Sequence, residues 1–205
     1  RFGGDIPKQF IKINGQEILS FSVNTFLDHP QIDEVIIVYH PDWKEHVITN
    51  YPNCIVIEGD QRRQDSSMKG VSVVSDESEH VLIHDAVRPF VSKKIISDCL
   101  SALENSDGSA PIMSVSNSLI QLEKEKATYI DRSQIREVQT PQCFRKELIS
   151  EALSSDIEST DDIGIVLRLF PESKLSFIPG NRDNFKITTE MDLQLAIQIF
   201  DSLQA

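Results

Sequence analysis

The chain has 205 residues and a formal net charge of −12, with 40% hydrophobic and 25% charged residues. This size and composition predict a single globular domain over residues 1–205 and exclude an intrinsically disordered chain. The acidic balance predicts no nucleic-acid partner, because such binding usually depends on a basic surface. The longest apolar runs are strand-sized, far below the ~20 residues of a membrane span, so no membrane partner is expected.

In the first half of the chain, short apolar runs alternate with helical patterns. Three β-branched runs predict buried strands: 35–39, 55–57 and 81–83. Residues 17–27 and 92–103 carry apolar side chains at helical spacing, and Ser92 is a suitable N-cap for the second helix. This alternation predicts a three-layer α/β domain, with helices on both faces of a mainly parallel sheet.

Residues 110–144 depart from this alternation of strands and helices. Three short strand patterns follow one another without a long helix between them: 112–115, 118–122 and 127–130. The charged run 123–126 suits an exposed turn, so we expect a β-hairpin that projects from the sheet as an arm at about 113–138. The doubly wound pattern then resumes in four predicted elements: helices 147–153 and 162–169, strand 175–178 and helix 189–203.

Cysteine usage indicates the compartment. Cys54, Cys99 and Cys143 are odd in number and widely spaced, which argues against a disulfide framework and against a zinc site. Such a chain suits a reducing compartment, so we expect a cytoplasmic protein.

Polar clusters follow several of the predicted strands, at the edge where open α/β sheets bind ligands. Residues 1–10 form a loop with Gly, Pro and two cations, and a plain surface turn explains it as well. Residues 59–66 follow a strand and open a helix, whose N–H groups can bind an anion; a capped helix start without a ligand is equally consistent. Two later loops, 131–142 and 180–188, read as solvated turns when taken singly.

A further cluster, residues 84–90, follows the strand at 81–83 and carries Asp85 and Arg88. A carboxylate at the tip of a buried strand is well placed to hold Mg²⁺, which prefers carboxylate and phosphate oxygens. The alternative is a structural ion pair between Asp85 and Arg88. The position at the ligand-binding edge favours a functional site, with His84 in a structural rather than a catalytic role.

Taken together and in chain order, these segments resemble the 2-C-methyl-D-erythritol 4-phosphate cytidylyltransferase family. The resemblance covers nearly the whole chain. It is carried by Pro7-Lys8-Gln9-Phe10, Gly59 with Arg63 and Ser66, His84-Asp85-Ala86-Val87-Arg88-Pro89-Phe90, Asp131-Arg132, Gln139-Thr140-Pro141-Gln142, Thr160-Asp161-Asp162 and Asn184-Phe185-Lys186-Ile187-Thr188. Ribitol-5-phosphate cytidylyltransferases share much of this pattern.

The resemblance implies a fold and a reaction. The fold is a Rossmann-like nucleotidyltransferase domain whose hairpin arm embraces a second subunit, giving a homodimer. The reaction transfers CMP from CTP to a small sugar-alcohol phosphate and releases pyrophosphate, with Mg²⁺ as the divalent cation. Such transfer depends on in-line positioning and charge neutralisation rather than on covalent catalysis.

The resemblance also implies roles for individual residues. Four cations are expected to be catalytic: Arg1, Lys8, Arg132 and Lys186. The nucleotide is expected to contact Gly59, Asp60, Ser66 and Asp85. The acceptor is expected to contact Asp85, Arg88, Ser118, Arg132 and Thr140, partly across the dimer interface. Asp85 is also the expected metal ligand.

The sequence departs from the family pattern at several positions. The family has a first strand and a Gly-rich loop just upstream of the position of Arg1, and neither is present, so we expect the sequence to be part of a longer protein. Asp60 stands where a second Gly is usual, which affects cytosine readout. Asn117 and Ser118 replace Asp and Thr, and Arg136 stands where Trp is frequent.

Two alternatives follow from these observations. Within the same class, the acceptor is ribitol 5-phosphate instead of methylerythritol phosphate. In another class, the chain is a non-catalytic nucleotide-binding module, motivated by the absent Gly-rich loop.

Overall fold

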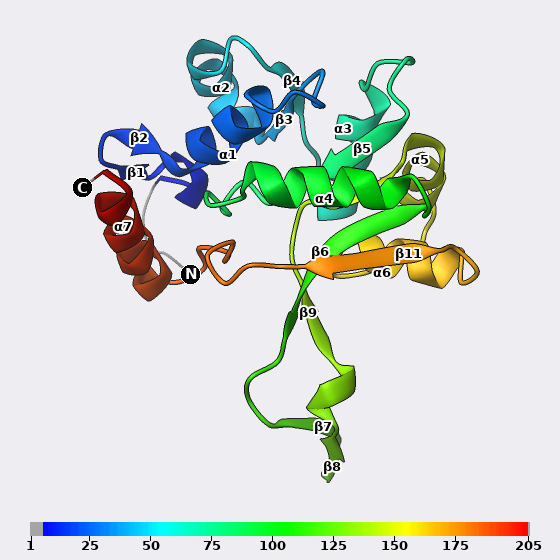
Figure 1. The fold of residues 1–205 in the computed structure, drawn as a ribbon. Coiled ribbons are helices and arrows are strands. Elements are labelled where there is room, and N and C mark those ends of the chain that lie inside the picture. The colour runs from blue at the N-terminus through cyan, green and yellow to red at the C-terminus, as the bar shows by residue number, and fades with distance from the viewer. Residues whose placement is uncertain (1–5, 205) are drawn as a thin grey trace.

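A computed structural model describes residues 6–204 and has a mixed α/β architecture (Figure 1). Its helices are α1 (Ile18–Leu27), α2 (Lys44–Asn50), α3 (Arg63–Ser72), α4 (Lys93–Leu103), α5 (Lys146–Leu153), α6 (Asp162–Leu169) and α7 (Glu190–Gln204). Its strands are β1 (Lys12–Ile13), β2 (Gln16–Glu17), β3 (Ile36–Tyr39), β4 (Ile55–Glu58), β5 (His80–Ile83), β6 (Gly108–Ser114), β7 (Leu119–Glu123), β8 (Lys126–Ile130), β9 (Arg136–Val138), β10 (Gln142–Arg145) and β11 (Leu175–Pro179). Three short 3₁₀ helices are η1 (Lys8–Phe10), η2 (Pro41–Trp43) and η3 (Arg132–Gln134).

The main sheet has the order β11-β6-β10-β5, with β9 paired to β6. β11 is parallel to β6, but β10 is antiparallel to both of its neighbours. The chain leaves the sheet through β6, runs out along β7 and back along β8, and returns through β9 and β10. This hairpin-like path makes β10 antiparallel to β6. The sheet is therefore mixed.

Helices cover both faces of this sheet, as expected for a three-layer domain. Adjacent residues of β10 point to opposite faces: Cys143 packs with α4 residues such as Cys99, whereas Phe144 packs with Ile149 of α5 and Val166 of α6. The predicted N-cap is confirmed, because the hydroxyl of Ser92 accepts a hydrogen bond from the N–H of Ile95 at 3.2 Å.

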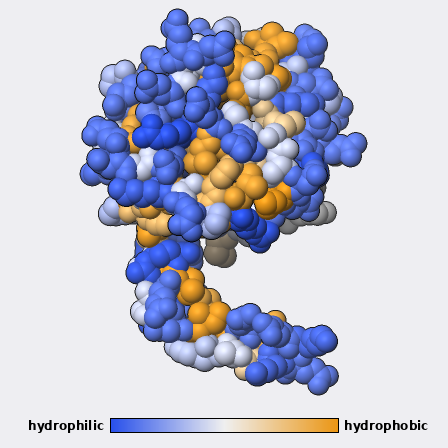
Figure 2. All heavy atoms as spheres, turned by 90° about the vertical axis from the view of Figure 1, so that its right-hand side faces the viewer, coloured by the Kyte–Doolittle hydropathy of each residue, from blue (hydrophilic) through white to orange (hydrophobic). Residues whose placement is uncertain are grey.

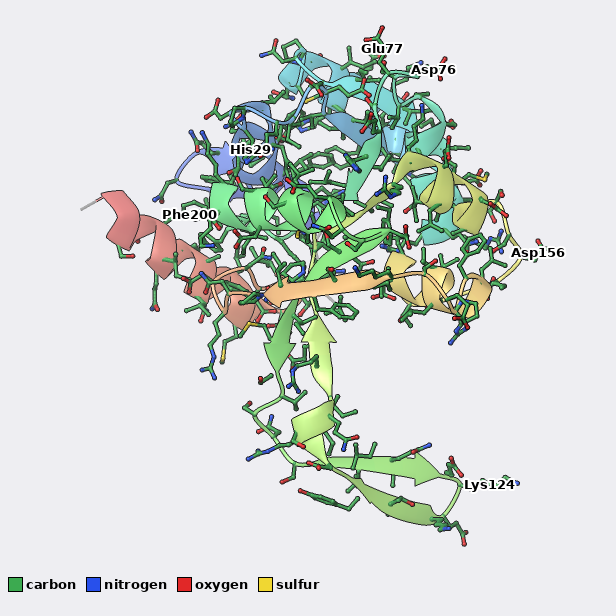
Figure 3. All side chains as sticks on the ribbon, turned by 45° about the vertical axis from the view of Figure 1, so that its right-hand side comes forward. His29, Asp76, Glu77, Lys124, Asp156 and Phe200 are labelled. Atoms are coloured by element: carbon green, nitrogen blue, oxygen red, sulfur yellow. The ribbon has the colours of Figure 1, made fainter. Side chains whose placement is uncertain are left out.

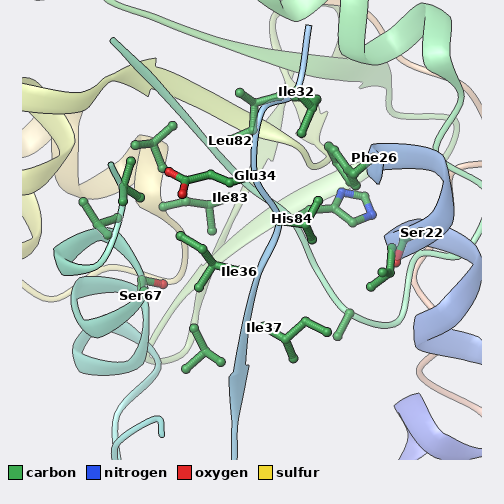
Figure 4. A pocket seen from close by; sticks show the side chains of 18 of the residues that line it. Ser22, Phe26, Ile32, Glu34, Ile36, Ile37, Ser67, Leu82, Ile83 and His84 are labelled. Carbon is green, nitrogen blue, oxygen red and sulfur yellow. The ribbon is translucent and has the colours of Figure 1, made fainter. Parts of the chain in front are cut away.

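β3 and β4 form a separate parallel pair. Within residues 6–204, β3 and β5 do not pair with each other, and a cavity of about 690 Å³ lies between them (Figure 4). Both strands line this cavity together with α1 and α3. In the part of the chain that is described, no helix has the length and apolar character needed to cross a membrane.

The predicted arm is present. β7 and β8 form an antiparallel hairpin at the end of an extension made by β6 and β9, and it projects away from the layered part of the molecule (Figure 1). Lys124 lies at its tip (Figure 3). The turn therefore falls in the charged run where it was predicted.

An aromatic cluster joins the C-terminal helix to loops near the ends of the main strands. The Phe200 ring of α7 lies 3.9 Å from Phe21 and 4.6 Å from Phe90, centroid to centroid. Phe90 in turn lies 5.6 Å from Phe185. These contacts bring the loop 84–90 and the segment around Phe185 together.

Candidate active site

Asp85 is the centre of a charged cluster just beyond the end of β5. Its Oδ2 accepts a hydrogen bond from Arg88 Nε at 2.9 Å, and its Oδ1 accepts one from Lys186 Nζ at 3.0 Å. Burial opposes ionisation of this carboxyl, but Arg88 and Lys186 outweigh that cost and lower its pKa. Asp85 is therefore ionised, and two cations from distant segments meet at it.

Two amides hold the C-terminal loop against this cluster. Asn184 is fully buried; its side-chain amide donates to Thr140 O at 2.8 Å, and its carbonyl accepts from Arg88 Nη1 at 2.8 Å. Gln139 donates to Asn181 O at 2.8 Å. Lys186 thus lies on a loop that is fastened to the segment just before β10.

Lys8 reaches the same loop from the N-terminal side. Its Nζ donates to Thr188 O at 3.0 Å, and Ile187 N donates to Val87 O at 2.9 Å. Three cations from three segments, Lys8, Arg88 and Lys186, therefore gather at one end of the molecule. In a chain of net charge −12, this local concentration of cations suits a phosphorylated ligand.

Thr140 and His84 form a hydrogen-bond chain behind Asp85. Thr140 Oγ1 accepts from Asp85 N at 3.1 Å and lies 3.0 Å from His84 Nδ1. His84 Nε2 lies 3.0 Å from Arg88 O. Burial lowers the pKa of His84 from 6.5 to about 4, so this ring is neutral at pH 7. Thr140 is itself buried, and its hydroxyl is engaged within the protein.

The expected nucleotide loop lies on the other side of the cavity. Ser66 Oγ accepts from Asp60 N at 2.9 Å, and Lys69 Nζ lies 2.9 Å from the Asp60 carboxylate. A Cβ on Gly59 would lie 3.0 Å from Ser66 Oγ and 3.1 Å from Val38, so this tight turn favours glycine. Ser66, Asp85 and Lys186 line the same cavity, which brings the two clusters to one space.

Of the predicted site residues, Ser66, Asp85 and Lys186 line the cavity, whereas Arg132 and Ser118 lie on the arm. Arg132 lies in η3 on the arm, where its guanidinium donates to Ser116 O, and Ser118 lies just before β7 (Figure 1). A separate hollow of about 420 Å³ at the arm is lined by Asp131, Arg132 and Arg136 among others. Arg1 lies outside the described residues.

The donor set at Asp85 suits a metal that arrives with phosphate. Within residues 6–204, no three His, Cys, Asp or Glu side chains cluster into a metal site. Mg²⁺ commonly takes only one or two carboxylates and completes its shell with phosphate oxygens and water. Asp85 can supply such a carboxylate once Lys186 turns to a phosphate.

One network near the site was not predicted from the sequence. Arg63 makes a bidentate pair with the buried carboxylate of Asp162, at 3.0 and 2.5 Å. Gln142 Oε1 accepts from the N–H groups of Asp162 and Ile163, which fastens α6 to β10. Both Arg63 and Asp162 stand in the segments that carried the family resemblance, but nothing in their spacing indicates that they pair.

Comparisons with known proteins identify the family of the chain. The family of 2-C-methyl-D-erythritol 4-phosphate cytidylyltransferases matches residues 1–202. The enzyme of that name from Thermotoga neapolitana is 32% identical over 96% of this chain and 89% of its own length. The bifunctional ribulose 5-phosphate reductase/CDP-ribitol pyrophosphorylase of Haemophilus influenzae is 30% identical over 98% of this chain and 46% of its own length.

A solved structure extends this likeness to the fold. The crystal structure of 2-C-methyl-D-erythritol 4-phosphate cytidylyltransferase from Thermus thermophilus superposes with a TM-score of 0.83 at 29% identity, covering 95% of this chain and 94% of that one. A family match over nearly every residue decides the classification, and it sets aside the non-catalytic module. The chain belongs to the 2-C-methyl-D-erythritol 4-phosphate cytidylyltransferase family and is a nucleotidyltransferase.

Proposed function

We propose that this protein transfers CMP from CTP to 2-C-methyl-D-erythritol 4-phosphate at the cavity between Ser66 and Asp85. A phosphate oxygen of the acceptor attacks the α-phosphorus of CTP. The bond from that phosphorus to the bridging oxygen breaks, and pyrophosphate leaves with the electron pair. The observation that carries the proposal is the meeting of Arg88 and Lys186 at the ionised carboxylate of Asp85, with Lys8 bonded to Thr188 O on the same loop as Lys186.

Each group has a role that its position supports. Lys8 and Lys186 stabilise the negative charge that develops on the phosphate oxygens, which is the main way proteins assist phosphoryl transfer. Arg88, held by Asp85 and by the Asn184 carbonyl, orients the acceptor. The loop of Gly59, Asp60 and Ser66 holds the nucleotide.

Mg²⁺ is the proposed cofactor, with Asp85 as its protein ligand. When bound, Mg²⁺ neutralises charge on the nucleotide phosphates. With a phosphorylated ligand in place, Lys186 would exchange its bond with Asp85 for one with a phosphate oxygen. The ion pair at 3.0 Å therefore represents the resting arrangement of the site.

The arm supports a homodimer. Ile120 and Tyr129 are cross-strand partners on one face of the hairpin, and Leu122 pairs with Ala127 on the same face. Ile120, Leu122 and Tyr129 are 60, 68 and 69% exposed in a single chain, and apolar residues are visible along the arm in Figure 2. In such a dimer, a second copy of the chain would cover this face. Arg132 and Ser118 on the arm of one subunit would then lie close to the Asp85 cluster of the other subunit.

Pyrophosphate release tests the proposal. The protein is mixed with CTP and Mg²⁺, and methylerythritol phosphate or ribitol 5-phosphate is added separately. We expect Mg²⁺-dependent release with methylerythritol phosphate. A clear preference for ribitol 5-phosphate, which the likeness to the CDP-ribitol pyrophosphorylase makes the second candidate, would reassign the acceptor. If CTP binds but neither acceptor causes pyrophosphate release, the proposed reaction is rejected.

A further inference from the structure

His84 lies between three groups of the proposed site but has no place in the reaction above. It follows β5 directly and faces Phe26 of α1, with the two rings 5.2 Å apart (Figure 4). Its two ring nitrogens lie 3.0 Å from Thr140 Oγ1 and 3.0 Å from Arg88 O. The ring therefore spans from the start of β10 to the end of the turn that begins at Asp85.

The donors and acceptors around His84 and Thr140 determine where the protons of these two side chains lie. The N–H of Asp85 can only donate, so Thr140 Oγ1 accepts from it at 3.1 Å. The Arg88 carbonyl can only accept, so His84 Nε2 carries the proton that it receives. The Thr140 hydroxyl has a single proton, and His84 Nδ1, at 3.0 Å from Oγ1, is an acceptor within its reach. The chain runs from Asp85 N–H through Thr140 and His84 to Arg88 O.

This chain closes a short turn. Arg88 N donates to Asp85 O at 3.0 Å, so Asp85 and Arg88 are already joined through their backbones. His84 holds the far end of the turn, at the Arg88 carbonyl, and Thr140 holds the near end, at the Asp85 N–H. The turn carries the carboxylate and the guanidinium that face each other at 2.9 Å. Its backbone orientation therefore sets where both charged groups point.

We propose that His84 is a positioning residue whose Nε2–H donates to Arg88 O and whose Nδ1 accepts from Thr140, and that this link holds Asp85 and Arg88 in their working geometry. The inference deepens the proposed function and rests on it for its kinetic consequence. Both ring nitrogens of His84 are engaged within the protein, so the residue acts through Asp85 and Arg88 and transfers no proton to the substrates. Small displacements of groups that orient substrate commonly reduce turnover by about 10- to 100-fold.

Steady-state kinetics test the two hydrogen bonds of His84, one with Thr140 and one with Arg88 O. His84→Phe keeps a ring and removes both hydrogen bonds, and Thr140→Val keeps the shape of Thr140 and removes its hydroxyl. We expect each to lower kcat/KM for the acceptor by about 10- to 100-fold, and Thr140→Ser to stay close to the unmodified protein. Because both residues act through one chain, the double variant should be no worse than the more severe single variant. Additive losses, or unchanged constants in His84→Phe, would overturn the proposal.

The chain offers a matched control. His29 is also buried, and its Nε2 lies 2.9 Å from the hydroxyl of Ser97 (Figure 3). His29→Phe removes a comparable contact away from the cavity, so it should reduce thermal stability without changing kcat or KM. If His84→Phe does not fold, His84→Asn and His84→Gln take its place. Asn keeps an acceptor near the Nδ1 position, and Gln keeps a donor near the Nε2 position, so each retains one of the two links.

Nitrogen-15 resonances of the imidazole give a readout that needs no substrate. We expect a protonated Nε2 and an unprotonated Nδ1 for His84 at neutral pH, and a shift of the Nδ1 resonance in Thr140→Val that His29→Phe does not cause. A protonated Nδ1 would overturn the proposal even in an enzyme with full turnover. The unmodified protein could show the expected tautomer and yet release no pyrophosphate with either acceptor. That result would reject the proposed reaction and leave the hydrogen-bond chain established.

Discussion

At the scale of single residues, Asp85 is shared between two cations that come from different parts of the chain. Arg88 lies three positions away and is 12% exposed in its side chain, whereas Lys186 is 44% exposed. The two partners therefore differ in exposure. Arg88 is fixed also by Asn184 O at 2.8 Å, whereas the more exposed Lys186 side chain has room to turn from Asp85 to a ligand, and Asp85 then keeps its bond with Arg88.

Replacement of Lys186 tests this division of roles. Lys186→Ala should lower kcat by about 100- to 1,000-fold, as removal of one charge-stabilising donor does in other enzymes, while the fold persists. Steady-state kinetics and thermal unfolding measure the two effects. Lys94→Ala is the matched control, because Lys94 forms an exposed pair with Asp98 at 2.6 Å on α4. Turnover of Lys186→Ala close to that of Lys94→Ala would contradict the assignment.

His84 predicts a pH dependence of stability. Because burial lowers its pKa from 6.5 to about 4, the unfolded chain binds a proton in this window that the folded chain does not bind. The free energy of unfolding should therefore fall as the pH drops from 6.5 toward 4. Between pH 7 and pH 5, urea unfolding should show a loss of about 2 kcal/mol relative to His84→Phe. Parallel pH profiles for the two proteins would contradict this prediction.

At the scale of elements, β10 connects most parts of the site. Its first residue, Gln142, fastens the N-terminus of α6, and Thr140 just before it contacts Asp85 N and His84. Arg63, the first residue of α3, reaches Asp162, the first residue of α6. The starts of α3 and α6 are thus held together beside the nucleotide loop.

The pair of Arg63 and Asp162 should matter for stability. Asp162 is fully buried, so Arg63→Met leaves an uncompensated charge inside the protein. We expect the free energy of unfolding to fall by about 3 kcal/mol. This value is at the low end for a broken buried pair, because the Arg63 side chain is 41% exposed. The double variant Arg63→Met/Asp162→Asn should recover part of this loss in urea unfolding. Arg62→Met is the neighbouring control: its pairs with Asp65 and Glu158 are exposed, so its loss should be much smaller. Equal losses for the two arginines would contradict the prediction.

The arm hairpin allows a test of assembly with a control on the same strand. Leu122→Asp places a charge on the exposed apolar face, whereas Gln121→Asp places the same charge on the opposite face. We expect Leu122→Asp to dissociate the proposed dimer and to reduce turnover, and Gln121→Asp to do neither. Sedimentation velocity and the pyrophosphate assay measure both effects. A monomeric unmodified protein, or a Leu122→Asp variant that assembles normally, would contradict the proposed role of the arm.

At the scale of the whole molecule, the sequence predicted some elements well and missed others for identifiable reasons. The run 81–83 matches β5 (His80–Ile83), and the helix pattern 162–169 matches α6 (Asp162–Leu169), because a long or β-branched apolar pattern leaves few alternatives. β10 was not predicted. Only Cys143 and Phe144 are apolar in its four residues, and it becomes a strand because both neighbours supply hydrogen-bond partners.

The candidate site divides in the same way. The cations and Asp85 could be named from the sequence because they stand in segments that resemble a known family. The positions of Arg132 and Ser118 on the arm, away from Asp85 in one chain, could not be read from those segments, since sequence order carries no information about distance. His84 was assigned a structural role, but its partners Thr140 and Arg88 O could not be named, and the part that Asn184 plays in holding the loop was missed, because a structural histidine or asparagine has no distinctive spacing.

The sequence by itself determined the family, the α/β class and the presence of a projecting hairpin, because these depend on local apolar periodicity, charge and short motifs. Tertiary structure alone decided that Lys186 and Arg88 share one carboxylate, that β10 runs antiparallel to its neighbours, and that His84 joins Thr140 to Arg88. Residues 85 and 186 lie 101 positions apart. Contacts at that separation depend on how the layers pack, and packing is a property of the whole chain.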